Sequence, residues 1–187
     1  RIIAIANEYG IPVLVDAAQS VQHLDHDVQA LDADFYAFSG HKIYGPTGVG
    51  VLYGKEKWLE EMPPFLSGGE MIENVTCDKV TFNTLPFKFE AGTPDVSGPI
   101  GLAAAIDYLI QFDPAELKDY ETDLLNYGLE LLSDIPDLTI YGNPKHRSSI
   151  LPFNVAGIQH YDMGVLLDNY GIAVRTGQHC TQPVMDA

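Results

Sequence analysis

The chain has 187 residues and a formal net charge of −16, because 26 acidic residues stand against only 10 Lys and Arg. This balance argues against nucleic-acid binding, which needs basic side chains to neutralise phosphates. No apolar run reaches the roughly 18 residues of a membrane span. The apolar stretch at the start is broken by Asn7, Glu8, Gly10 and Pro12, and no small-residue cleavage site follows it, so no signal peptide is expected.

The first part of the chain predicts an open α/β sheet. A helical tail over 1–10 ends at a glycine, and IPVLVDAA over 11–18 is a short apolar run ending in an acid, typical of a buried parallel strand. A short helical piece at 28–31 precedes a second strand in DFYAFSGHK, over 34–42, which leads directly into a polar tip. A glycine-rich turn and a third strand over 50–53 follow.

The later part predicts a change of domain. KEKWLEEM predicts a short helix that ends at Pro63 and Pro64, and residues 65–96 are expected to be irregular. A helix over 97–112 has a proline near its first turn. The remaining elements are expected to be a helix from 115 to about 134, strands in LTIYG and SILPFNV, a helix in HYDMGVLLDNYG and a strand in IAVRTG. We therefore predict two domains, with residues 1–112 belonging to one α/β domain and 113–187 to a smaller one.

An acid and a lysine end the first two predicted strands. Asp16 lies at the carboxyl end of the first strand, and Lys42 lies just past that of the second. Ligands of open parallel sheets bind in the crevice at these ends, so we expect both side chains to face one crevice. Alone, the pair favours a salt bridge at the sheet edge. The alternative is a site for pyridoxal 5'-phosphate (PLP), in which an acid pairs with the pyridinium nitrogen and a lysine forms a Schiff base.

The neighbouring residues favour the cofactor site. Ser39, Gly40 and His41 directly precede Lys42 and offer a hydroxyl, an unobstructed backbone and a ring N–H to a phosphate at a tight turn. Gln19, soon after the first strand, can donate to a ring oxygen. Each signal is weak alone, since a serine before a glycine is usually only a turn.

Two cysteines and two histidines are the other reactive side chains of interest. Cys77 and Cys180 are far apart, and without a secretion signal we expect reduced thiols in a cytoplasmic protein. Free cysteines are most often buried, but the polar segment GQHC favours an exposed loop for Cys180. His23 and His26 lack the further ligands that a metal site needs, so no metal is expected.

Four motifs, in order along the chain, resemble those of the class V, NifS-like family of PLP enzymes. VDAAQ and FSGHKIYGPTGVGVLY carry the general likeness, and FEAGTP and RTGQHC narrow it to the group II, SufS-like cysteine desulfurases. The resemblance covers essentially the whole chain and implies the α/β architecture of fold type I PLP enzymes. Residues 1–112 would belong to the mostly parallel-sheet, PLP-binding large domain, and 113–187 to the small C-terminal domain that carries the cysteine loop.

The resemblance implies five cofactor ligands. Lys42 corresponds to the lysine that carries PLP, Asp16 to the acid on the pyridine nitrogen, and Gln19 to the donor to the phenolic oxygen. Ser39 and His41 correspond to ligands of the phosphate.

Three further correspondences concern the partner subunit and the substrate. Thr93 in FEAGTP corresponds to a residue that reaches the phosphate of the neighbouring subunit, which implies a homodimer. Arg175 corresponds to one of two arginines that hold the substrate carboxylate, and Cys180 to the cysteine that takes up sulfur. Gln178 and Thr181 depart from the His and Ala of many relatives, at positions without essential chemistry in the family.

The implied activity is that of a PLP-dependent cysteine desulfurase. It converts L-cysteine to L-alanine and forms a persulfide on Cys180, and a Suf-type acceptor protein receives the sulfur for iron–sulfur cluster assembly. A selenocysteine lyase acting on L-selenocysteine, or another class V lyase or aminotransferase, is an alternative, although an aminotransferase needs no thiol. A catalytically silent chain is a further alternative, against which the joint presence of Lys42, Asp16 and Cys180 argues.

The two ends of the chain indicate a piece of a longer enzyme. There is no initiator Met, the first residues read as a helix tail, and the last ones stop in a loop. Under the resemblance, the missing parts would supply the side chain that stacks on the cofactor ring and the second carboxylate-binding arginine.

Overall fold

The structure is a computed structural model that describes residues 1–24, 26–142, 144 and 147–186. Its contacts divide the chain into two compact units, Arg1–Lys118 and Asp119–Ala187. The boundary falls inside α5 (Pro114–Ser133), a few residues beyond the domain boundary expected from the sequence.

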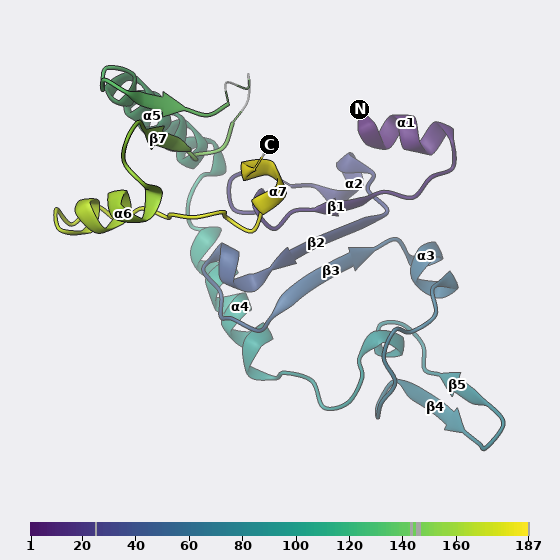
Figure 1. The fold of residues 1–187 in the computed structure, drawn as a ribbon. Helices are drawn as coiled ribbons and strands as arrows, with labels where there is room; N and C mark the ends of the chain where they lie inside the picture. The colour runs from purple at the N-terminus through teal and green to yellow at the C-terminus, as the bar shows by residue number, and fades with distance from the viewer. Residues whose placement is uncertain (25, 143, 145–146, 187) are drawn as a thin grey trace. The chain divides into compact units, whose positions relative to one another are not determined.

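A three-stranded sheet in the order β1-β2-β3 forms the centre of the first unit (Figure 1). β1 (Leu14–Asp16) runs parallel to β2 (Phe35–Ser39), and β3 (Gly50–Gly54) runs antiparallel to β2. Asp16 pairs with Ala37, and Ser39 pairs with Gly50. The carboxyl ends of β1 and β2 therefore share one edge of the sheet, as the sequence predicted.

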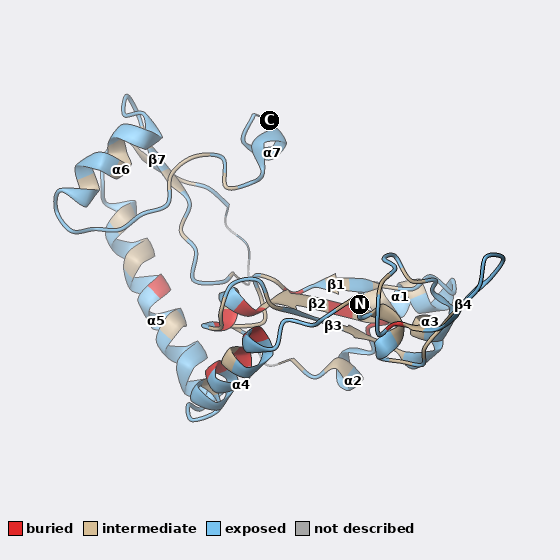
Figure 2. Ribbon diagram, turned by 90° about the horizontal axis from the view of Figure 1, so that it is seen from below, coloured by how far each residue is buried: buried red, intermediate tan, exposed pale blue. Residues whose placement is uncertain are grey.

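The strand IPVLVDAA is less buried than its composition predicts. Leu14 is 57% exposed, and β1 has a neighbouring strand on one side only within the described residues. Many buried residues of this unit instead lie on β2, on the 3-10 helix η1 (Gly40–Ile43) and on α4 (Ser97–Leu109), as Figure 2 shows, while Ala17, Ala33 and Met71 are buried in the connections between elements. Those on the three elements include Tyr36, Ile43, Leu102 and Ala105.

The remaining helices of this unit are α1 (Ile2–Glu8), α2 (Val28–Leu31), α3 (Glu56–Glu61) and the 3-10 helix η2 (Phe87–Phe89). Asp27 begins α2, because its carboxylate accepts hydrogen bonds from the N–H groups of Gln29 and Ala30 at 2.8 and 3.0 Å. Asp95 acts in the same way at the start of α4, where it accepts from the N–H groups of Ser97 and Gly98.

The prediction of irregular chain over 65–96 is wrong in part. β4 (Ile72–Val75) and β5 (Val80–Phe82) form an antiparallel hairpin that extends away from the main sheet (Figure 1). Its turn is closed by the N–H of Thr76, which donates to the carbonyl of Lys79 at 2.8 Å. The segment carries little hydrophobic alternation, in keeping with a β4 that is mostly exposed, so sequence periodicity gave no strand signal.

The second unit contains a two-stranded antiparallel sheet of β6 (Leu138–Ile140) and β7 (Phe153–Val155), with α6 (His160–Asp168) and α7 (Gln182–Met185) after it. Gln159 begins α6 by accepting hydrogen bonds from two backbone N–H groups of its first turn. The predicted strand IAVRTG is wrong, because this segment pairs with no strand in the described part of the unit. α7 was not predicted.

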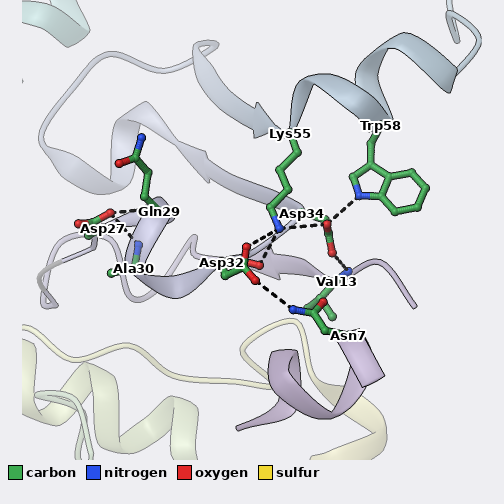
Figure 3. Close-up of polar contacts among 9 residues, drawn as sticks. All are labelled: Asn7, Val13, Asp27, Gln29, Ala30, Asp32, Asp34, Lys55 and Trp58. Atoms are coloured by element: carbon green, nitrogen blue, oxygen red, sulfur yellow. Dashed lines mark hydrogen bonds and ion pairs between the residues drawn. The ribbon is translucent and has the colours of Figure 1, made fainter. Parts of the chain in front are cut away.

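A buried acid connects segments of the first unit that lie far apart in the sequence (Figure 3). Asp34 is 2% exposed and accepts hydrogen bonds from the Val13 N–H at 2.9 Å and from Trp58 Nε1 at 2.7 Å. Lys55 Nζ lies 3.3 Å from Asp34 and 2.6 Å from Asp32. Burial raises the pKa of Asp34, but the Val13, Trp58 and Lys55 contacts more than compensate, so the pKa lies below its ordinary value of 3.8.

This network predicts a pH-dependent contribution to stability. A carboxyl with a lower pKa in the folded state stabilises the fold above the unfolded pKa of about 3.8 and loses this effect as pH falls through the lower folded value. Asp34→Asn should lower the free energy of unfolding by about 1–3 kcal/mol near neutral pH, and the deficit should shrink toward pH 3. Urea unfolding of the full-length protein measures both. Asp78→Asn, an exposed acid of the hairpin turn, is the matched control, and an equal Asp34 deficit at both pH values would contradict the assignment.

Within the described residues, no helix has the length and apolar character needed to cross a membrane. Nor do three metal-ligating side chains lie together anywhere in that part of the chain.

Candidate active site

A tight turn at the end of β2 displays the motif SGHK. The strand ends at Ser39, and η1 carries His41 and the half-buried Lys42. The Gly40 N–H donates to the carbonyl of Val49 at 2.8 Å, which ties the turn to the start of β3. A Cβ on Gly40 would lie 2.8 Å from Val49 Cγ1, so a larger residue would force this turn apart.

The turn after β1 brings a second group of polar side chains to the same sheet edge. The Ala17 N–H donates to the carbonyl of Ala37 at 2.9 Å and so extends the pairing with β2. The Ala18 N–H donates to Asp16 Oδ1 at 3.0 Å, which fixes the carboxylate on one side. Asp16 Oδ2 accepts no hydrogen bond from the described residues, and the Gln19 side chain is exposed. One carboxylate oxygen is thus open to a ligand.

Lys42 and Asp16 do not form the salt bridge that was the simpler interpretation of the sequence. No ion pair joins Lys42 to any residue that the structure describes, whereas Lys55 pairs with Asp32 and Asp34 at the opposite edge of the sheet. The side chains of Ser39 and His41 likewise make no hydrogen bond with the described residues. A cation, an anion, a hydroxyl and an imidazole therefore lie at one edge, and apart from Asp16 Oδ1 their side-chain polar atoms make no hydrogen bond with the described residues.

Thr93 lies in the same unit, in an exposed segment that leads into α4. The preceding Gly92 has a φ of 79° and donates its N–H to the carbonyl of Gly69 at 2.9 Å. No hydrogen bond within the described residues joins Thr93 to the SGHK turn. The structure therefore gives Thr93 an anchored position and does not bring it together with Lys42.

Arg175 and Cys180 lie in the second unit and contact each other. Arg175 Nη2 is 3.8 Å from Cys180 Sγ, the distance of a weak hydrogen bond to sulfur, and both side chains are exposed. Three left-handed residues, Gly177, His179 and Cys180, fold the loop back so that residues five apart can meet. The exposed loop expected for Cys180 is confirmed, and both cysteines are free thiols.

A hollow of about 410 Å³ also lies in the second unit, lined by residues of β6, β7 and the start of α6. None of the eight site residues predicted from the sequence lines it. Its position gives no reason to move the candidate site from the sheet edge.

Sequence reasoning did miss the packing of Val49 and Leu102 against Gly40, which holds the SGHK turn, because these contacts are not local in sequence.

Comparisons with known proteins place the chain in a family. Residues 1–187 match the family described as aminotransferase class-V. A cysteine desulfurase from Salmonella agona (strain SL483) is 53% identical over 184 residues, which make up 98% of this chain and 45% of that protein. The crystal structure of the cysteine desulfurase CsdA (S-sulfonic acid) from Escherichia coli matches with a TM-score of 0.91 and 47% identity, over 97% of this chain and 45% of that one.

A mutant of C-DES with glycine covalently linked to the PLP cofactor matches with a TM-score of 0.80 and 27% identity, over 94% of this chain and 48% of that one. The chain spans 45% of the length of the Salmonella protein and 45% of that of the Escherichia coli protein. The likenesses confirm the expected fold class, a part of the α/β fold of fold type I PLP enzymes. Because the family match runs over every residue, the chain belongs to the aminotransferase class-V family.

Proposed function

We propose that the full-length protein is a PLP-dependent cysteine desulfurase of the group II, SufS-like kind, acting in the cytoplasm. The observation that carries this proposal is Lys42, half-buried and without an ion-pair partner among the described residues, on a turn at the sheet edge that Asp16 shares. The relatives named cysteine desulfurase support the substrate, L-cysteine.

The polar groups at this edge fit PLP by their chemistry. Lys42 would hold the cofactor covalently, and Asp16 would accept a hydrogen bond from the protonated pyridine nitrogen. Gln19 would donate to the phenolic oxygen, and Ser39 and His41 would bind the phosphate. When bound, PLP acts as an electron sink that makes the Cα proton of an attached amino acid acidic.

The side chains of the chain itself would perform the remaining steps. Lys42 Nζ, once released, would move the Cα proton, and Arg175 would bind the substrate carboxylate with its guanidinium. The Cys180 thiolate would attack the sulfur of the bound cysteine. A sulfur–sulfur bond forms as the carbon–sulfur bond breaks, so that the products are alanine and a persulfide on Cys180. The exposure of Cys180 suits transfer of that sulfur to a Suf-type acceptor protein for iron–sulfur cluster assembly.

Visible absorption of the purified full-length protein tests the proposal most directly. The wild-type protein should show the band of lysine-bound PLP and should release alanine from L-cysteine. Release of alanine from L-selenocysteine but not from L-cysteine would favour the second candidate, a selenocysteine lyase. A protein with no PLP band after purification in the presence of the cofactor would contradict both.

Thr93 supplies a test of the homodimer that the proposal includes. If Thr93 reaches the phosphate bound by the partner subunit, Thr93→Ala should weaken PLP binding by about 1–3 kcal/mol, the range of a hydrogen bond to a charged group. Titration of the apoenzyme with PLP measures this, and Thr76→Ala in the hairpin turn is a matched control. A full-length enzyme that is monomeric and fully active in dilute solution would contradict the shared site.

A further inference from the structure

The short helix α3 ends in an unusual way. In an α-helix the carbonyls of Leu59 and Glu60 would accept hydrogen bonds from the N–H groups four residues later. Those positions are Pro63 and Pro64, which have no N–H. The chain that follows α3 therefore lacks the two donors that these carbonyls would ordinarily use, and unsatisfied carbonyls weaken a helix end.

Lys88 supplies both missing donors. Its Nζ donates to the carbonyl of Leu59 at 2.8 Å and to the carbonyl of Glu60 at 2.8 Å. A cation at this place also interacts favourably with the negative end of the helix. The ammonium lies 5.4 Å from the centre of the Phe89 ring, and the Lys88 side chain is half-buried. These contacts bridge 28 and 29 residues of chain.

The segment that Lys88 anchors continues directly into FEAGTP. Its far side is held by the Gly92 N–H, which donates to the carbonyl of Gly69 at 2.9 Å. A Cβ on Gly68 would lie 3.1 Å from the backbone nitrogen of Gly92, so the backbone at Gly68 and the backbone at Gly92 approach each other closely. Residues 88–92 are thus fixed at one end by α3 and at the other by the Gly68–Gly69 backbone. Thr93 is the next residue.

We propose that Lys88 is a positioning residue for Thr93: by capping the proline-terminated end of α3, it fixes the segment that presents Thr93 to a cofactor phosphate. The inference rests on the proposed function, since Thr93 has this task only in a PLP enzyme. Nothing in the sequence motif itself assigns a role to Lys88. The pair Pro63-Pro64 is the signal that could have indicated a missing donor.

The test is a set of variants of the full-length enzyme, titrated as apoenzyme with PLP. Lys88→Met keeps the length of the side chain and removes the donor, and should raise the PLP dissociation constant about tenfold. Lys88→Arg keeps a charged donor and should restore the constant to within about twofold. Lys79→Met removes an exposed lysine of the same excursion and should leave it unchanged. If Lys88→Met does not fold, Lys88→Gln replaces it.

The double variant separates a positioning role from a merely structural one. If Lys88 acts through Thr93, adding Lys88→Met to Thr93→Ala should weaken PLP binding no further than about twofold. Additive losses, or an Arg variant as weak as the Met variant, would overturn the inference. So would a Thr93→Ala variant that loses PLP while Lys88→Met keeps it, and that result would leave the proposed function standing. A wild-type enzyme without PLP would overturn both.

Discussion

Lys42→Ala is expected to abolish turnover of L-cysteine by the full-length enzyme. The variant loses the amine of the SGHK turn. Among the described residues, this amine has no ion-pair partner that would occupy it. If Ser39, His41 and Asp16 bind PLP as proposed, their contacts would still hold the cofactor, so the variant should contain PLP and lack activity. Removal of the amine also removes the group that would move the Cα proton.

Borohydride reduction followed by peptide mapping identifies the lysine independently of activity. Reduction fixes PLP on the amine that carries it, and the labelled peptide should contain Lys42. Lys79→Ala is a matched control, since it removes an exposed lysine and should keep both label and activity. Label on another lysine of the wild-type enzyme would contradict the assignment, even if Lys42→Ala were inactive.

The part of this site that sequence reasoning predicts well is the part built from neighbouring residues. Ser39, His41 and Lys42 share one turn because a strand end and a glycine at position 40 leave the chain little choice there. The common edge with Asp16 follows from the parallel pairing of β1 with β2, which the two apolar runs already indicate.

Contacts between distant residues were not predictable in this way. Asp34 was part of the predicted second strand, and no local signal indicated its contacts with Trp58 and Lys55, which lie 21 or more residues further along the chain. The contacts of Lys88 were likewise not predictable, because its two carbonyl partners lie 28 and 29 residues away in the sequence. Periodicity and local motifs carry no information about such pairs, because the pairing depends on where the chain returns after a turn.

The segment IAVRTG marks a different limit. Its β-branched residues favour extended chain, and the segment is not helical, but a strand also needs a neighbour for its backbone groups. The described part of the second unit has two strands, β6 and β7, that pair only with each other. Composition therefore predicted a strand that does not form in the described part of this unit.

Cys180→Ala separates a desulfurase from the other PLP enzymes that the same sheet edge could serve. If Cys180 only packs, its loss should cost some stability and leave the chemistry intact. Its exposure and its contact with Arg175 argue against a packing role. As sulfur acceptor, it is needed only after the substrate has bound. The variant should therefore keep PLP and bind L-cysteine normally. It should release alanine at least roughly two orders of magnitude more slowly than the wild-type enzyme, because no thiolate attacks the sulfur.

Two further measurements sharpen that expectation. Cys77→Ala is the matched control, since Cys77 is also an exposed free thiol, and this variant should release alanine at the wild-type rate. Mass spectrometry of the wild-type enzyme after incubation with L-cysteine should find one added sulfur on the Cys180 peptide and none on that of Cys77. L-Selenocysteine should retain part of its turnover in Cys180→Ala, because selenium leaves carbon more readily than sulfur does. If Cys180→Ala releases alanine from L-cysteine at the wild-type rate, the assignment as a cysteine desulfurase is contradicted. The protein would then be a class V lyase whose site is built on Lys42 and Asp16.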